Sequence, residues 1–167
     1  MADLASVIVG GLLTLGAGGA TQLALHVLKT DAEHKTKRAT KFEELVTALY
    51  EYDHWLDTMR NVRVFGDEAK PSMSPYAKVH SIASLYFPNF MESIAKLNLE
   101  ADKYELWMMR EGQKRFRKEL DDLGNGGVEA SEAYRKCRIR LISELQSYGS
   151  LQFKQGPIAS KVANYFR

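Results

Sequence analysis

Residues 4–28 read LASVIVGGLLTLGAGGATQLALHVL, and this stretch decides the fold prediction. It contains no charged side chain, and Asp3 and Lys29 bound it on either side. A helix of about 25 residues that rises about 1.5 Å per residue spans roughly 37 Å. The hydrocarbon core of a bilayer is only about 30 Å thick. We therefore predict a single transmembrane helix within residues 1–28.

Two other interpretations of this segment stay open. A cleaved signal peptide begins with a basic region, whereas the residues before this stretch include Asp3 and no Lys or Arg. The small residues at 17–20 are compatible with a cleavage site. A core helix of a soluble protein rarely runs so far without a charge on any face. A retained membrane helix is the favoured interpretation.

Small and polar residues interrupt the apolar segment. Gly16, Ala20 and Ala24 form a row of small residues four apart, which lets two membrane helices approach closely. A second set of small and polar residues lies together on a helical wheel: Gly11, Thr14, Gly18, Thr21 and Gln22. We predict that this face packs or lines a homo-oligomer, with a polar conducting path as the finer hypothesis. The alternative is that the glycines are merely tolerated, because glycine is common in membrane helices.

Residues 29–41 form a basic collar directly after the apolar stretch. Its only acidic residues are Asp31 and Glu33, and its basic residues are Lys29, Lys35, Lys37, Arg38 and Lys41. Basic residues next to a membrane helix favour the cytoplasmic side. We therefore expect a single-pass membrane protein with the C-terminal domain in the cytoplasm. The collar could also contact the anionic headgroups of membrane lipids.

Residues 42–167 have the pattern of a helical bundle. Apolar residues recur there at steps of three and four, which is typical of amphipathic helices, beginning with Phe42, Leu45, Val46, Leu49, Tyr52, Leu56 and Met59. Further helices are expected over residues 76–87, 89–123 and 129–148, with a short amphipathic end at 158–166. Loops are expected at 66–75, at Pro88 and at the Gly124–Gly127 turn. No strand pattern is present, so the fold class is predicted to be all-α.

The composition bears on several classes of function. The net charge is only +2 over 167 residues, so nucleic-acid binding must depend on local clusters. Cys137 is the single cysteine and can form neither an intramolecular disulfide nor a Cys-rich metal site. The four histidines are scattered, and no phosphate-binding loop or nucleophile elbow is present. We expect no enzymatic activity, no cofactor and no bound metal.

Basic residues are concentrated on both sides of the Gly124–Gly127 turn. They are Arg110, Lys114, Arg115, Arg117 and Lys118 before it, and Arg135, Lys136, Arg138 and Arg140 after it. If two antiparallel helices pack about this turn, Arg115 should lie beside Lys136. The two clusters, with Phe116 and Tyr134 among them, would then form one site for a nucleotide or oligonucleotide. The alternative is a set of solvated helix faces with ion pairs, because acidic residues lie four positions from several of these basic residues.

The order of a Gly-rich span, a basic collar and a helical domain resembles small membrane effectors of bacterial anti-phage systems. Two types of effector have a similar architecture: the DNA-gated membrane effector of Hailong defence and the membrane accessory protein of type VI-B CRISPR systems. The resemblance covers the whole chain, and it concerns the order of these segments alone. The chain departs from the CRISPR type because no Arg lies a few residues before any His. The resemblance implies an oligomer that permeabilises or depolarises the inner membrane, and a partner protein from a defence system.

These observations lead to two functional hypotheses. The first is an oligomeric, ligand-gated channel or membrane-disrupting effector of antiviral defence, whose basic hairpin senses an anionic ligand. The second is a membrane-anchored helical adaptor without channel activity. An anchored enzyme is disfavoured, because no catalytic constellation is present.

Overall fold

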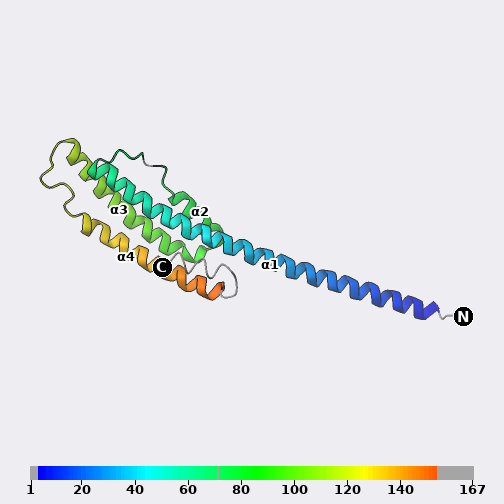
Figure 1. Ribbon diagram of the computed structural model, residues 1–167. Coiled ribbons are helices and arrows are strands. Elements are labelled where there is room, and N and C mark those ends of the chain that lie inside the picture. Colours follow the sequence, from blue (N-terminus) through cyan, green and yellow to red (C-terminus); the bar gives the residue numbers. More distant parts are fainter. Residues whose placement is uncertain (1–3, 71, 154–167) are drawn as a thin grey trace. The chain divides into compact units, whose positions relative to one another are not determined.

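The computed structural model describes the backbone of residues 4–70 and 72–153, and within these ranges the side chains at residue 26 and from residue 28 onward. The described residues form helices and connections without a strand, which confirms the all-α fold class (Figure 1). The elements are α1 (Leu4–Arg60), the π-helix η1 (Asn61–Phe65), α2 (Tyr76–Tyr86), the 3₁₀-helix η2 (Pro88–Phe90), α3 (Met91–Phe116) and α4 (Gly127–Gln152).

The chain divides into two units, residues 1–40 and residues 41–167. We predict a membrane helix at residues 1–28. The small and polar face of this helix lies outside the side chains that the structure describes, and it consists of Gly11, Thr14, Gly18, Thr21 and Gln22. Among the described residues no helix is both long and apolar enough to cross a bilayer. In the basic collar, Lys35 and Asp31 form an exposed ion pair at 2.6 Å.

The second unit has one hydrophobic core, built on the predicted apolar face of residues 42–59. Of these positions, Leu49 is half-buried and the others are buried. They pack with apolar residues from the other helices, among them Ile94, Leu97, Ala101 and Met108 of α3 and Tyr134, Leu141 and Leu145 of α4. A stripe of apolar residues at helical spacing must be removed from water, and three helices that share a core achieve this.

An aromatic cluster joins α1, α4 and the segment from Phe87 through η2 at one end of this core. The Phe42 and Phe87 rings meet edge to face at 5.6 Å, and the Tyr148 ring meets the Phe90 ring in the same way at 5.3 Å. Pro88 begins η2 directly after Phe87, at the predicted break. Proline ends the helix there because it lacks a backbone N–H for the next hydrogen bond.

The third helix ends earlier than predicted. The apolar pattern predicts a helix that reaches residue 123, but α3 ends at Phe116. Lys118 has a left-handed backbone with φ 63°, its N–H donates to the Arg115 carbonyl at 3.0 Å, and the Glu119 N–H donates to the Lys114 carbonyl at 3.0 Å. This pair of bonds is a Schellman motif, which satisfies the last carbonyls of a helix and stops it. Residues 117–126 therefore form the connection to α4.

The longer connection changes the register between α3 and α4. Tyr104 stacks with Tyr134 at 6.4 Å, and the Ser93 hydroxyl donates to Glu144 at 2.7 Å. Lys136 follows Tyr134 by two residues, so it lies opposite the part of α3 near residue 102, roughly 20 Å along the helix from Arg115. The expected pairing of Arg115 with Lys136 is therefore wrong, and the two basic clusters do not meet.

Candidate anion-binding site

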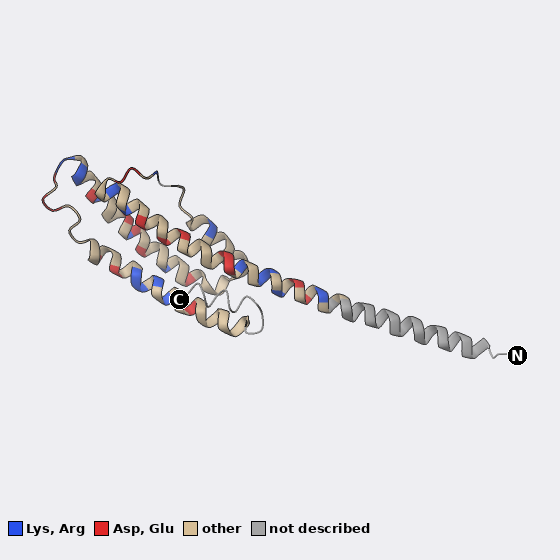
Figure 2. Ribbon diagram, viewed as in Figure 1, with Lys and Arg blue, Asp and Glu red and all other residues tan. Residues whose placement is uncertain are grey.

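The nine basic residues predicted as an anion site fall into three groups. Figure 2 shows basic residues near the end of α3 and along α4. Lys114, Lys136 and Arg140 form ion pairs with acidic residues three or four positions away, at 2.8, 2.7 and 3.2 Å. The pairs of Lys136 and Arg140 match the alternative of solvated helix faces, whereas Lys114 pairs with the buried Glu111. Arg110 and Lys118 are exposed and line neither cavity described below. Arg115 and Arg117 line one cavity, and Arg135 and Arg138 line another.

The first cavity, which we term the arginine groove, lies where η1 meets the end of α3. It has a volume of about 700 Å³. Its lining residues are Val62, Arg63, Met109, Gly112, Gln113, Arg115, Phe116 and Arg117. The groove therefore joins two residues of the predicted anion site, Arg115 and Arg117, to Arg63, which is not part of that predicted site. Arg63 belongs to the segment that follows α1, and nothing in its local pattern indicates that it meets the end of α3.

Two glycines create the space for this arrangement. Gly66 ends η1 in a left-handed conformation with φ 81°, and a Cβ atom there would lie 1.6 Å from a guanidinium nitrogen of Arg115. Gly112 lets α3 approach η1, because a Cβ atom there would lie 3.1 Å from the Arg63 carbonyl oxygen. Close backbone approach of this kind is a common structural use of glycine. A side chain at Gly66 would displace Arg115.

The arginine groove carries positive charge that its own lining does not neutralise. Among its described lining residues none is Asp or Glu. The Arg63 guanidinium is 3.9 Å from the Glu105 carboxylate, a long contact, and its Nη1 atom is buried without a hydrogen-bond partner in the described structure. Burial raises the pKa of Glu105, and the nearby Arg63 opposes this shift. Arg115 and Arg117 are both exposed.

The carboxylate of Glu111, next to Gly112 in the sequence, binds groups outside the groove. Glu111 is buried, with 3% of its surface exposed. It accepts a hydrogen bond from the Gly124 N–H at 2.8 Å and pairs with Lys114 at 2.8 Å. These bonds lower the pKa of Glu111, with the Lys114 hydrogen bond as the largest cause. Glu111 thus holds the connection against α3 rather than neutralising the groove.

An exposed aromatic ring lies in the same groove. Phe116, the last residue of α3, is 90% exposed, and Phe65 at the end of η1 is 62% exposed. Of the two, only Phe116 lines the groove, where its exposed ring is accessible to a ligand. A ring beside guanidinium groups can stack on a nucleobase while the guanidinium groups pair with phosphate.

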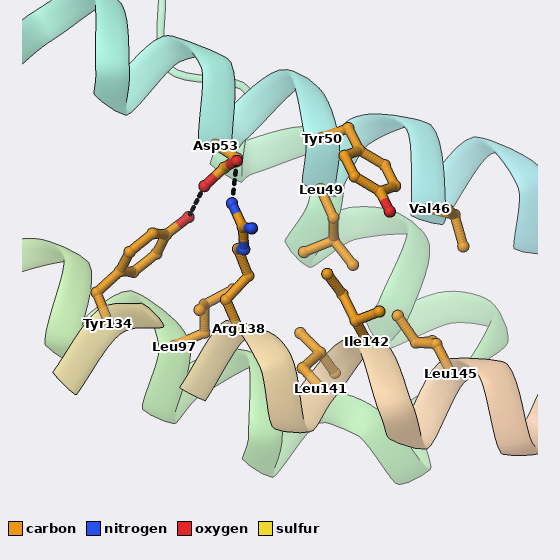
Figure 3. A pocket seen from close by; sticks show the side chains of 10 residues that line it. All are labelled: Val46, Leu49, Tyr50, Asp53, Leu97, Tyr134, Arg138, Leu141, Ile142 and Leu145. Atoms are coloured by element: carbon orange, nitrogen blue, oxygen red, sulfur yellow. Dashed lines mark hydrogen bonds and ion pairs between the residues drawn. The ribbon is translucent and has the colours of Figure 1, made fainter. Parts of the chain in front are cut away.

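The second cavity, which we term the interhelical cleft, lies between α1, α3 and α4. It has a volume of about 270 Å³, and its lining residues are Asp53, Leu56, Asp57, Arg60, Tyr104, Ser131, Tyr134, Arg135, Arg138 and Ile139. Asp53 is its central acceptor, because one carboxylate oxygen accepts from the Tyr134 hydroxyl at 3.1 Å and the other pairs with Arg138 (Figure 3). Burial raises the pKa of Tyr134, so its hydroxyl stays a donor to Asp53.

An apolar seam continues from this network along α1 and α4. Figure 3 shows Val46 and Leu49 of α1 facing Ile142 and Leu145 of α4, on one side of the Asp53–Arg138 pair. The seam encloses only about 20 Å³. Space of that size holds about one water molecule, so the seam is packed core rather than a ligand site.

Both cavities have the chemistry of binding. No Ser, Thr or Cys lies beside a His in the described lining of either one. Within residues 4–70 and 72–153, as far as their side chains are described, no three His, Cys, Asp or Glu residues gather as a metal site would require. Guanidinium groups, hydroxyls and an exposed ring can hold an anion. No protein-family model, curated protein or solved structure matches this chain.

Proposed function

We propose that this chain is a membrane-anchored, oligomeric effector whose helical domain binds a single-stranded nucleic acid in the arginine groove. One observation carries the proposal: Arg63, Arg115 and Arg117 line a groove whose described lining includes no carboxylate, next to the exposed ring of Phe116.

The chemistry of the groove fits this ligand. The planar guanidinium group pairs with phosphate through two parallel hydrogen bonds. Single-strand binding combines a positive groove with aromatic rings, and each stacked base contributes about 1–3 kcal/mol. The groove volume of about 700 Å³ lies in the range of known ligand sites, which is roughly 300–1,000 Å³.

The membrane part of the proposal depends on the sequence. The uncharged stretch at 4–28 supports a span, its small residues support self-association, and the collar at 29–41 supports a cytoplasmic helical domain in a bacterial inner membrane. In an anti-phage role, the nucleic acid would act as the signal and a change in membrane permeability as the response. The ligand can shift the equilibrium between an open and a closed state of the effector only if it binds the two states unequally.

Oligonucleotide binding tests the proposed site directly. The full-length chain in non-ionic detergent is titrated into a short fluorescent single-stranded DNA at several salt concentrations, and anisotropy reports binding. Arg117→Gln should weaken binding about tenfold, or about 1.4 kcal/mol. It should also reduce the slope of log affinity against log salt by about 0.7, because one fewer phosphate is contacted. Phe116→Ala should weaken binding by about 1–3 kcal/mol.

Two control variants separate the groove from general charge and apolar surface. Lys136→Gln removes an exposed charge that is paired with Glu132 on α4. Leu151→Ala removes an exposed apolar side chain near the far end of α4. Both should bind DNA like the wild type. Absence of wild-type binding at low salt, or equal losses in the controls, would refute the proposed site.

The exposed rings of Phe65 and Phe116 also favour a second candidate, a membrane-anchored adaptor that docks a protein partner on this surface. Conductance separates the two functions. The effector should conduct ions across a planar bilayer when the oligonucleotide is added, whereas the adaptor should leave the conductance unchanged.

A further inference from the structure

The interhelical cleft contains more cationic than anionic side chains. Three arginines line it, Arg60, Arg135 and Arg138, against two aspartates, Asp53 and Asp57. It shares no residue with the arginine groove.

Arg60 is largely occupied by its neighbours. Its Nη1 atom lies 3.3 Å from Asp57, and its Nε and Nη2 atoms each lie 3.3 Å from the Asn61 side-chain oxygen. A further contact joins it to the Tyr104 hydroxyl, where Arg60 opposes the rise in the pKa of Tyr104 that burial causes. Arg60 therefore supplies charge to the cleft wall rather than free donors.

Arg135 and Arg138 keep donors. They lie three residues apart on α4 and line the same cleft. Arg138 pairs with Asp53 through Nη1, but its Nε–H is buried and has no partner in the described structure. Arg135 forms no ion pair within 4 Å with any acidic residue in the described ranges. A buried guanidinium N–H without an acceptor is costly, so the Arg138 side chain would gain by turning this N–H toward an oxyanion in the cleft.

The volume of the cleft is sufficient for a small tetrahedral anion. One water molecule needs about 10–15 Å³ of such space, so the 270 Å³ of the cleft leaves room for an oxyanion and its waters. The apolar side chains of Leu56 and Ile139 form part of the wall.

We propose that the interhelical cleft is a second anion site, which binds inorganic phosphate or the terminal phosphate of a phosphomonoester between Arg135 and Arg138. This site is separate from the nucleic-acid groove and does not depend on the function proposed for it.

Binding of inorganic phosphate to the full-length chain in non-ionic detergent tests this site. Isothermal titration with sodium phosphate is compared with sodium chloride at matched ionic strength, and thermal unfolding is followed in the same buffers. Phosphate should bind and raise the unfolding midpoint, whereas chloride should do neither. Arg135→Gln should weaken phosphate binding about tenfold, because it removes one charged donor. This variant leaves the Asp53–Arg138 pair in place, so the fold should be retained, and circular dichroism checks this.

Lys136→Gln is the matched control, because it removes the same charge from the adjacent residue, which does not line the cleft. It should leave phosphate affinity unchanged, as should Arg115→Gln in the arginine groove. A titration with adenosine monophosphate distinguishes the two sources: tighter binding than phosphate assigns the site to phosphomonoesters, and equal or weaker binding assigns it to free phosphate. No binding of either ligand, or equal affinity in wild type and Arg135→Gln, would overturn the proposal.

Discussion

Replacement of Asp53 by Asn tests how strongly the contact between α1 and α4 stabilises the helical domain. Asp53 accepts a hydrogen bond from the Tyr134 hydroxyl with one oxygen and pairs with Arg138 through the other. Asparagine keeps the shape of the side chain, but it removes the charge and leaves only one acceptor oxygen. At least one of the two donors therefore loses its partner.

The expected cost follows from burial. A hydrogen bond to a charged group contributes about 1.5–3 kcal/mol to stability when water is excluded. The side chain of Asp53 is 22% exposed and that of Arg138 is 38% exposed, so water replaces part of the lost interaction. We expect Asp53→Asn to lower the free energy of unfolding by about 2 kcal/mol.

Urea unfolding of the full-length chain in non-ionic detergent, followed by circular dichroism, measures this cost. Asp57→Asn is the matched control, because Asp57 is 56% exposed and lies 3.3 Å from Arg60. An exposed pair of this kind contributes little, so the control should lose less than about 0.5 kcal/mol. The double variant Asp53→Leu, Arg138→Met should lose less than Asp53→Asn, because it leaves no unpaired charge. Equal losses in Asp53→Asn and Asp57→Asn would refute this reasoning.

Three further predictions concern the end of α3. Lys118→Gly should raise the free energy of unfolding by about 1 kcal/mol, because φ 63° strains a residue with a Cβ atom; an unchanged urea midpoint would contradict this. Gly66→Ala should lower stability by about 1–3 kcal/mol and weaken oligonucleotide binding, since its φ is 81° and its Cβ atom would collide with Arg115; a variant that is as stable as the wild type would argue against the described geometry. The pKa of Glu111 is lowered from 4.5, chiefly by Lys114, so its stabilising effect is present above that value and is lost as the pH falls through the lowered pKa. Glu111→Gln should therefore show a shallower loss of stability on acidification than the wild type, and parallel profiles would contradict this.

The helices of the second unit were largely predictable because their signals are local. The spacing of Phe42, Leu45 and Tyr52 marks one buried face, and these residues are buried in the core. Pro88 marks a break, and a break is present there. Periodic burial and the lost proline N–H act within one or two turns of helix, so the sequence around each position carries the information.

The end of α3 was not predictable from the same signals. A left-handed helix cap is usually a glycine, and here it is Lys118, so the residue type conceals the stop. Leu120 and Leu123 continue the apolar pattern beyond Phe116, which extended the predicted helix. The Glu111 bond to the Gly124 N–H stabilises the connection, and a contact 13 residues away in sequence leaves no local trace.

The sequence by itself determined the all-α class, the apolar faces and the concentration of basic residues near the end of α3 and along α4, because each follows from residue type and short-range spacing. Only the tertiary structure decided how those basic residues are shared out: Arg115 and Arg117 with Arg63 in one groove, and Arg135 and Arg138 with Asp53 and its neighbours in another cleft. The physical reason is register. Antiparallel helices meet according to the length of their connection. With α3 stopping at Phe116 and a longer connection after it, Lys136 lies opposite the part of α3 near residue 102 rather than Arg115, a shift of roughly three to four turns.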